Sequence, residues 1–310
     1  MDVKSIRVIK ASGLDREGLL SLRIKELEST GLQVLFDDLT PNTNWLWTAG
    51  SIADRSNALN KALLEPNSDA IMWARGGYGC SDLLDLVPWE QVTKAKNKPI
   101  IGFSDVCAAQ SALYTKTGRL SIHGPMPATV TWKKSGTEDV SQLLSLITGM
   151  TSRGEISVVP VLDSPKSIGH CTLFGGCLSV LTSLIGTPYL PKSFAGYVLF
   201  FEDTGENPGR VMRMLNQWHQ AGLLRGVQAL VLGSFSEMGG GLPDSAPVLG
   251  EEVYHRYKLP TFTSCDFGHI SPNFPIVIGA SGKIVANSNQ NLSSSIMSWD
   301  ISGHEPIVST

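Results

Sequence analysis

A serine that follows a glycine by two residues is the strongest candidate for chemistry in this chain. Gly102 ends a short apolar run, Ser104 follows it, and a helical pattern begins at Asp105. A sharp strand-to-helix turn exposes a serine hydroxyl, and the first N–H groups of the helix can stabilise an oxyanion beside it. Alternatively, Ser104 only caps the helix, because serine is a good N-cap. Val106 replaces the second glycine of the esterase elbow, which disfavours a simple α/β-hydrolase.

A serine nucleophile needs a base, and six histidines are available. His123 and His269 each stand beside a glycine at the boundary of a predicted element. The residues alone do not choose between these two. The other four lie in polar helical stretches, near the C-terminus or before a predicted strand (His170, His219, His255 and His304).

The base usually needs an acid to orient it, and two carboxylates end the apolar run at 197–201. A half-buried carboxylate there requires a donor, and an imidazole N–H is one. We expect Glu202 to point inward and Asp203 to lie toward the following helix. Alternatively, one of them pairs with Arg210 or Arg213, or caps that helix.

A second loop is expected to share the serine's edge of the sheet. The apolar run at 70–74 ends in Arg75-Gly76-Gly77-Tyr78-Gly79. Strands that alternate with helices predict parallel βαβ units, in which ligands bind at the carboxyl ends of the strands. The loop after residue 74 and Ser104 both follow such ends, so they can line one rim.

Composition limits the class of protein. The 310 residues carry a net charge of −3, with no basic run for nucleic acid and no apolar stretch of about 20 residues. The five cysteines are scattered without a Cys-x-x-Cys pair, which argues against a disulfide framework and a zinc site. The N-terminus lacks the apolar region of a secretory signal. These features predict a cytoplasmic protein without a metal, a nucleic-acid partner or a membrane.

The chain is predicted to form two domains. An α/β domain that carries the nucleophile is expected over residues 1–150. A connection is placed at 151–168, where Gly154, Pro160 and Pro165 interrupt any helical period. A second domain over 169–310 would carry the glutamate and the histidine. Near its end, the apolar runs 275–279 and 283–286 straddle Ala-Ser-Gly and predict a hairpin.

Five motifs, in this order and spacing, resemble the serine L,D-carboxypeptidases of murein recycling, a family that includes the microcin-immunity peptidases. The resemblance extends from the first predicted strand to the last predicted hairpin. The motifs are Ala74–Gly79, Ile101–Asp105, Ile122–Met126, Phe201–Glu206 and Phe267–His269.

The resemblance implies both a fold and a triad. The fold is a flavodoxin-like N-terminal domain with a parallel sheet and a smaller C-terminal α/β domain, with the active site in the cleft between them. Ser104 would be the nucleophile, His269 the base and Glu202 the acid that orients the base. The substrate would be a murein tetrapeptide, cleaved between an L-configured centre and a terminal D-alanine. No cofactor is implied, and a homodimer is expected.

The oxyanion hole and the substrate contacts are predicted from the two loops. The N–H groups of Asp105 and Gly77 are expected to meet the oxyanion, because glycine allows close backbone approach. Arg75, Gly76 and Tyr78 are expected to bind substrate. The sequence departs from the family where Cys177 replaces an asparagine, and where Lys-Ala-Ser-Gly at 10–13 replaces a Pro-Ser turn.

Two other functions stay open. A microcin-immunity-type peptidase would share the triad and cleave a peptidyl-nucleotide. The nucleobase of that substrate could stack on a tryptophan ring. The chain offers four tryptophans for this, but they are equally suited to a hydrophobic core: Trp45, Trp47, Trp73 and Trp89. A phosphate binder could use the loop at 75–79 without catalysis, although both the Gly-x-x-x-x-Gly-Lys loop and a full Gly-x-Gly-x-x-Gly are missing.

Overall fold

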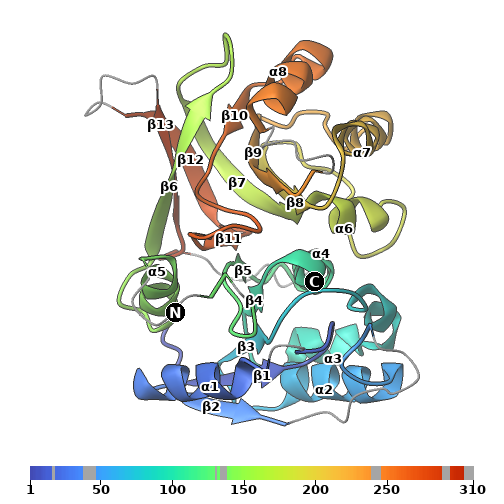
Figure 1. Ribbon diagram of the computed structural model, residues 1–310, viewed down its shortest axis with the longest axis vertical. Helices are drawn as coiled ribbons and strands as arrows, with labels where there is room; N and C mark the ends of the chain where they lie inside the picture. The colour runs from blue at the N-terminus through green and yellow to red at the C-terminus, as the bar shows by residue number, and fades with distance from the viewer. Residues whose placement is uncertain are drawn as a thin grey trace.

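The protein is described here from a computed structural model. The structure describes residues 1–15, 18–37, 47–129, 131–132, 138–238, 246–287 and 294–303. The described residues form two sheets, a six-stranded sheet A and a seven-stranded closed barrel, sheet B. In Figure 1 sheet A lies below the barrel, and its blue and cyan strands come from the first part of the chain.

Sheet A is built from five parallel strands and one antiparallel strand. Its strands are β1 (Ser5–Ile9), β2 (Gln33–Phe36), β3 (Ala70–Trp73), β4 (Ile100–Gly102), β5 (Ser121–His123) and β11 (Ile276–Ile278). Their order is β11-β5-β4-β3-β1-β2, so the parallel part has the order of flavodoxin-like sheets. β1, β3, β4 and β5 are buried along their whole length, which explains their continuous apolar runs.

Helices connect the parallel strands, as the alternating pattern predicted. They are α1 (Leu20–Ser29), α2 (Ile52–Leu64), α3 (Trp89–Lys94) and α4 (Cys107–Thr117), with 3₁₀ segments η1 (Ser81–Leu86) and η2 (Ser104–Val106). Helix α1 begins at Leu20. The Asp15 carboxylate accepts hydrogen bonds from the N–H groups of Leu19 and Leu20, which ends the preceding loop there.

The barrel contains the rest of the described strands. They are β6 (Arg153–Pro160), β7 (Ile168–Cys177), β8 (Tyr197–Thr204), β9 (Ala229–Ser236), β10 (Thr261–Thr263), β12 (Ser281–Ala286) and β13 (Ser295–Asp300). The pairs β7–β8, β8–β9 and β9–β10 are parallel. The barrel is closed by the antiparallel pairs β10–β6, β6–β13, β13–β12 and β12–β7. In Figure 1 the barrel's helices α6 (Leu178–Ser183), α7 (Pro208–Gln220) and α8 (Ala246–Tyr257) gather around β8, β9 and β10.

The hairpin prediction near the C-terminus is wrong. β11 pairs antiparallel with β5 in sheet A, whereas β12 pairs with β7 and β13 in the barrel. The turn at 279–280 therefore passes the chain from one sheet to the other. Each strand finds a partner distant in sequence, which local turn residues do not reveal.

The segment at 151–168, predicted as a connection, contains β6. Helix α5 (Glu138–Ile147) precedes this strand. Ile156 and Val158 are buried while Glu155 and Ser157 are exposed, so the strand has the alternation of a barrel strand with one buried and one exposed face. Gly154 and Pro160 at its ends gave the appearance of a loop.

The two sheets share one apolar core and are joined by hydrogen bonds. The Tyr114 hydroxyl of α4 lies 2.7 Å from the Tyr197 hydroxyl of β8. Next to it, Ser111 Oγ donates to the Tyr189 carbonyl oxygen at 2.6 Å. These contacts fix α4, the helix that follows Ser104, against the barrel. No helix in the described residues is long and apolar enough to span a bilayer.

Candidate active site

Ser104 has a backbone conformation that side chains rarely adopt. Its φ angle is +65°, in the left-handed region, at the first residue of η2. Neither η2 nor α4 has a side-chain cap hydrogen bond, so the alternative interpretation, in which Ser104 only caps the helix, is wrong. Gly102 makes the turn possible, because a Cβ there would lie 3.1 Å from the Val106 methyl carbons. The hydroxyl is thus held on a sharp turn without a structural partner there.

The loop after β3 packs directly on this serine. A Cβ added to Gly76 would lie 2.7 Å from Ser104 Oγ, so the Gly76 backbone covers one side of the hydroxyl. Gly77 has a φ angle of +115°, a conformation that favours glycine. The carbonyl oxygen of Gly76 accepts a hydrogen bond from the Gly13 N–H at 3.0 Å. The predicted shared rim of the two loops is therefore present.

Arg55 fixes the far end of this loop, a role that the sequence did not reveal. Its guanidinium is buried and donates from Nη1 to the Gly79 carbonyl oxygen at 2.6 Å. It also donates to the Gly50 carbonyl at 3.3 Å and contacts Asp82 at 3.3 Å. Buried guanidinium groups need several acceptors, and here these include the carbonyl oxygens of Gly79 and Gly50 and the Asp82 carboxylate.

Asp105 uses its side chain to brace the same region. Its buried carboxylate accepts a hydrogen bond from the Cys80 N–H at 2.8 Å. Burial raises the pKa of this carboxyl. The carboxylate is thus turned toward the protein interior, and the part of Asp105 that the predicted oxyanion hole would use is its backbone N–H.

Glu202 and His269 form the ion pair that the sequence predicted as acid and base. Nδ1 of His269 lies 2.7 Å from Oε2 of Glu202, whose side chain is fully buried. Burial opposes ionisation of Glu202, but His269 and His123 outweigh it and lower the pKa of Glu202 to about 2. Burial also opposes the charge on His269, but Glu202 raises its pKa above the usual value.

His269 also packs against the residue that precedes Ser104. The ring of Phe103, which precedes Ser104, meets the His269 ring edge-on with centroids 4.9 Å apart. Among the hydrogen bonds of the described residues, none joins Ser104 to His269. Catalytic hydrogen bonds in enzymes without substrate are often long and tighten when substrate binds.

His123, the other histidine that the residues left open, is fully buried against the same carboxylate. Its Nε2 lies 3.4 Å from Oε1 of Glu202. Sequence reasoning missed this contact, because it joins β5 of sheet A to β8 of the barrel. The one available signal is that His123 ends a strand beside the strand of Gly102.

The alternative partners considered for the two carboxylates are not used. Arg210 pairs with Glu206 at 2.6 Å, and Asn207 caps α7 by accepting from the Arg210 N–H at 2.9 Å. Asp203 instead accepts hydrogen bonds from the N–H of Ser179 at 2.7 Å and from its hydroxyl at 3.2 Å. Asp203 therefore fixes the start of α6, and Glu202 is left to the two histidines.

The predicted substrate-binding side chains lie next to the serine loop. Arg75 donates from Nη1 to the Leu14 carbonyl oxygen at 2.7 Å, and its buried Nε has no partner among the described residues. Tyr78 is half exposed and donates to Asp82 at 3.1 Å, a contact that raises the pKa of its hydroxyl.

The cysteines and tryptophans near the site are mostly core residues. Cys107 and Cys177 are buried, and burial raises the pKa of both thiols. Cys107 therefore behaves as the small apolar helix residue that its position suggests. Trp47 is 66% exposed, whereas Trp73 is fully buried and Trp89 is half-buried. Trp45 and His304 lie outside the described residues.

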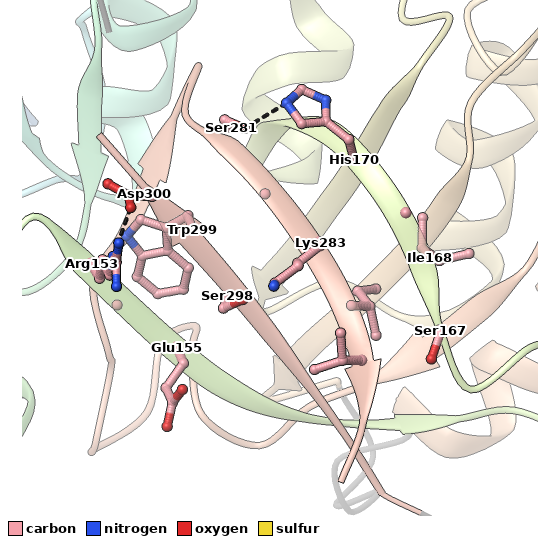
Figure 2. A pocket seen from close by; sticks show the side chains of 15 residues that line it. Arg153, Glu155, Ser167, Ile168, His170, Ser281, Lys283, Ser298, Trp299 and Asp300 are labelled. Carbon is pink, nitrogen blue, oxygen red and sulfur yellow. Dashed lines mark hydrogen bonds and ion pairs between the residues drawn. The ribbon is translucent and has the colours of Figure 1, made fainter. Parts of the chain in front are cut away.

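A separate cavity of about 770 Å³ lies on the barrel, away from these residues. Figure 2 shows it across β6, β13, β12 and β7, with Arg153 paired to Asp300 and His170 hydrogen-bonded to Ser281. None of the predicted site residues lines it. Ser281 and His170 form a hydrogen-bonded pair at 2.8 Å there, but among the described residues no carboxylate contacts the His170 ring, so the cavity lacks a complete triad.

Comparisons with known proteins agree with this arrangement. Residues 6–124 match the family described as LD-carboxypeptidase N-terminal domain, and residues 170–284 match the LD-carboxypeptidase C-terminal domain. A Bacillus subtilis protein named probable murein peptide carboxypeptidase is 30% identical over 82% of this chain and 80% of its own. The microcin C7 self-immunity protein MccF of Escherichia coli is 23% identical over 83% of this chain and 82% of its own.

The solved structures include one with the same overall arrangement. The muramoyltetrapeptide carboxypeptidase from Oxalobacter formigenes superposes with a TM-score of 0.81 at 26% identity, covering 96% of this chain and 99% of its own. The two family matches and these relatives together span both sheets and every predicted site residue. The chain belongs to the LD-carboxypeptidase family.

Proposed function

We propose that this protein is a serine-type L,D-carboxypeptidase that removes the terminal D-alanine from murein tetrapeptides. The observation that supports this most directly is the 2.7 Å contact between His269 and the buried Glu202, beside the strand that ends at Ser104. The relatives named as murein or muramoyltetrapeptide carboxypeptidases support the substrate class.

The proposed reaction begins with proton transfer from Ser104 to His269. A carboxylate can only accept a hydrogen bond, so Nδ1 of His269 carries the proton that faces Glu202. This leaves Nε2 free to take the Ser104 proton as the hydroxyl attacks the amide carbonyl. Glu202 then balances the charge of the imidazolium. His269 returns the proton to the leaving amine of D-alanine, and water releases the acyl group from Ser104.

The oxyanion would be held by backbone N–H groups of Asp105 and Gly77. The tight packing of Gly76 on Ser104 supports this assignment, because it brings the backbone of the loop close to the hydroxyl. Loss of one donor of this kind typically raises the barrier by about 3 kcal/mol.

The free carboxylate of the substrate needs a cation. Arg75 is a candidate, because its buried Nε has no hydrogen-bond partner among the described residues and a Cβ on Gly13 would lie 3.7 Å from it. Gly13 itself is hydrogen-bonded to Gly76. We therefore assign Arg75 to the terminal carboxylate, with Gly76 and Tyr78 forming the adjoining wall.

A second candidate function is cleavage of a peptidyl-nucleotide, as the relationship to the MccF protein suggests. The exposed indole of Trp47 favours it, because an exposed aromatic ring can stack on a base. By family resemblance we also propose a cytoplasmic homodimer.

Two assays test the proposal. The wild-type protein is incubated with a murein tetrapeptide or a peptidyl-adenylate, and D-alanine or nucleotide release is measured. D-Alanine release that Ser104→Ala abolishes supports the carboxypeptidase, whereas nucleotide release alone supports the second candidate. A fluorophosphonate probe should label the wild type at Ser104. Absence of labelling would favour a binding protein without serine catalysis.

A further inference from the structure

Glu202 lies between two histidines that come from different sheets. Its Oε2 faces Nδ1 of His269 at 2.7 Å, and its Oε1 faces Nε2 of His123 at 3.4 Å. The side chains of Glu202 and His123 are both fully buried. Each carboxylate oxygen therefore has one imidazole, and the two imidazoles differ in exposure, since His123 is fully buried and the His269 side chain is 18% exposed.

His123 is tied to the strand that carries the nucleophile. It is the register partner of Gly102, which lies two residues before Ser104. Phe103 stands between the two histidines, with its ring centroid 5.9 Å from that of His123 and 4.9 Å from that of His269. Glu202 and His269, by contrast, belong to the barrel. His123 is thus the polar link from the acid–base pair to the sheet of Ser104.

We propose that His123 is a positioning residue of the triad. It stays neutral and donates its Nε2–H to Oε1 of Glu202, which fixes the carboxylate, and through it His269, relative to the strand that ends at Ser104. The proposal rests on the proposed function, since it assumes that Ser104, Glu202 and His269 act together. A displacement of a catalytic group by about 1 Å can lower a rate roughly 100-fold, so such a link matters.

The surroundings of His123 favour the neutral form. The edges of Phe103, Phe200 and Phe267 surround its ring, with centroids 5.7 to 6.2 Å away. Its buried Nδ1 has no hydrogen-bond partner among the described residues, so a proton there would be unsatisfied. One carboxylate balances one imidazolium, and catalysis places that charge on His269.

The charged groups near the pair are few. Glu202, Asp203 and Glu237 act on His269, and His269 and His123 act on Glu202. The Cys107 thiol is also within electrostatic range of Glu202. Among the described residues, only His123 contacts Oε1 of Glu202, so its substitution changes the carboxylate that His269 faces and leaves the other charges in place.

The test compares His123→Phe, which keeps a ring and loses the donor, with His123→Gln, which keeps a donor. The rate of fluorophosphonate labelling at Ser104 is measured against pH in full-length protein. We expect labelling of His123→Phe to be roughly 10- to 100-fold slower. The acid limb of the profile, where the labelling rate falls as the pH is lowered, should move to higher pH in this variant. The reason is that Glu202 without its second donor holds the His269 proton more tightly. His123→Gln should restore most of the rate and the wild-type limb.

Two results would overturn the proposal. One is labelling of His123→Phe within about twofold of the wild type with an unmoved acid limb. The other is an equal loss in both variants with an unmoved limb, which would mean that His123 only fills space. Where a variant does not fold, ¹⁵N imidazole NMR of the wild type decides. A neutral Nε2–H tautomer of His123 throughout the titration of His269 supports the proposal, and an Nδ1–H tautomer or a charged ring contradicts it.

Failure of the proposed function would look different. Labelling needs no murein substrate, so a protein that labels at Ser104 but releases no D-alanine has the wrong substrate and leaves the His123 comparison valid. A wild type that does not label contradicts the serine mechanism, and the NMR tautomer still tests the contact of His123 with Glu202.

Discussion

The missing side chain of Gly76 makes room for the Ser104 hydroxyl. A Cβ at Gly76 would lie 2.7 Å from both Cβ and Oγ of Ser104 and 3.5 Å from the backbone nitrogen of Asp105. The first two distances are shorter than any ordinary carbon contact, so an added methyl group would displace the serine or the loop. We predict that Gly76→Ala lowers D-alanine release and fluorophosphonate labelling by at least about 100-fold while the protein still folds.

The matched control is Gly169→Ala. Gly169 lies in β7, where an added Cβ would meet no atom within 4 Å. This variant should keep wild-type labelling and release. Wild-type rates in Gly76→Ala would show that the loop does not confine the hydroxyl.

The left-handed backbone of Ser104 predicts an unusual stability order between two inactive variants. At a φ angle of +65°, a residue with a Cβ is disfavoured by about 1 kcal/mol relative to glycine. Both Ser104→Ala and Ser104→Gly should lose labelling. Ser104→Gly should nevertheless need more urea to unfold than Ser104→Ala, the reverse of the order in a strand or helix interior. Equal midpoints, or a more stable alanine variant, would mean that the turn relaxes to an ordinary conformation.

Local patterns were sufficient for the half of the site that belongs to sheet A. Parallel strands bring their carboxyl ends to one edge, so Ser104 and the loop at 75–79 could be placed together from periodicity alone. The pairing of Glu202 with His269 came from the family motifs instead. The residues themselves left His123 and His269 equivalent, because both follow apolar runs and adjoin glycines.

What could not be predicted depends on how the two sheets pack. His123 reaches Glu202 only because β5 faces β8 across the interface, and no sequence spacing encodes that approach. The same holds for β11, which leaves the barrel to pair with β5. β6 was missed for a local reason. Gly154 and Pro160 near its ends are typical of loops, and only a short part of the strand between them alternates between buried and exposed residues.

Arg55 should support both stability and catalysis. Its guanidinium is 2% exposed and donates to the carbonyl oxygen of Gly79, which ends the serine loop, and to that of Gly50. Arg55→Met would remove both hydrogen bonds, although the Gly50 oxygen keeps the Thr48 hydroxyl as a donor at 3.0 Å. We expect a loss of roughly 3 kcal/mol in unfolding free energy and slower labelling of Ser104. The readouts are urea unfolding and the labelling rate.

Arg256→Met is the control for Arg55→Met. Arg256 pairs with Glu252 on the exposed face of α8, and both side chains are more than 40% exposed. Such a pair contributes less than about 0.5 kcal/mol, so stability and labelling should stay close to those of the wild type. A similar effect of the two substitutions would contradict the special role of Arg55.

The pH dependence of labelling should follow His269. The neutral imidazole must accept the Ser104 proton, so activity is lost as the pH falls through the His269 pKa. Burial alone would lower that pKa, but Glu202 raises it above 6.5, and the acid limb should therefore lie above pH 6.5. Glu202→Gln removes the negative charge that favours the imidazolium, so the limb should move to lower pH while the maximal rate falls at least about 100-fold.

Glu206→Gln separates this effect from a general change of charge. Glu206 lies four residues beyond Glu202 but pairs with Arg210 and does not contact His269 among the described interactions. Its substitution should leave the limb within a few tenths of a pH unit, on the order of the small effects of exposed charges. If the limb of Glu202→Gln stays in place or moves upward, Glu202 does not hold the charge on His269.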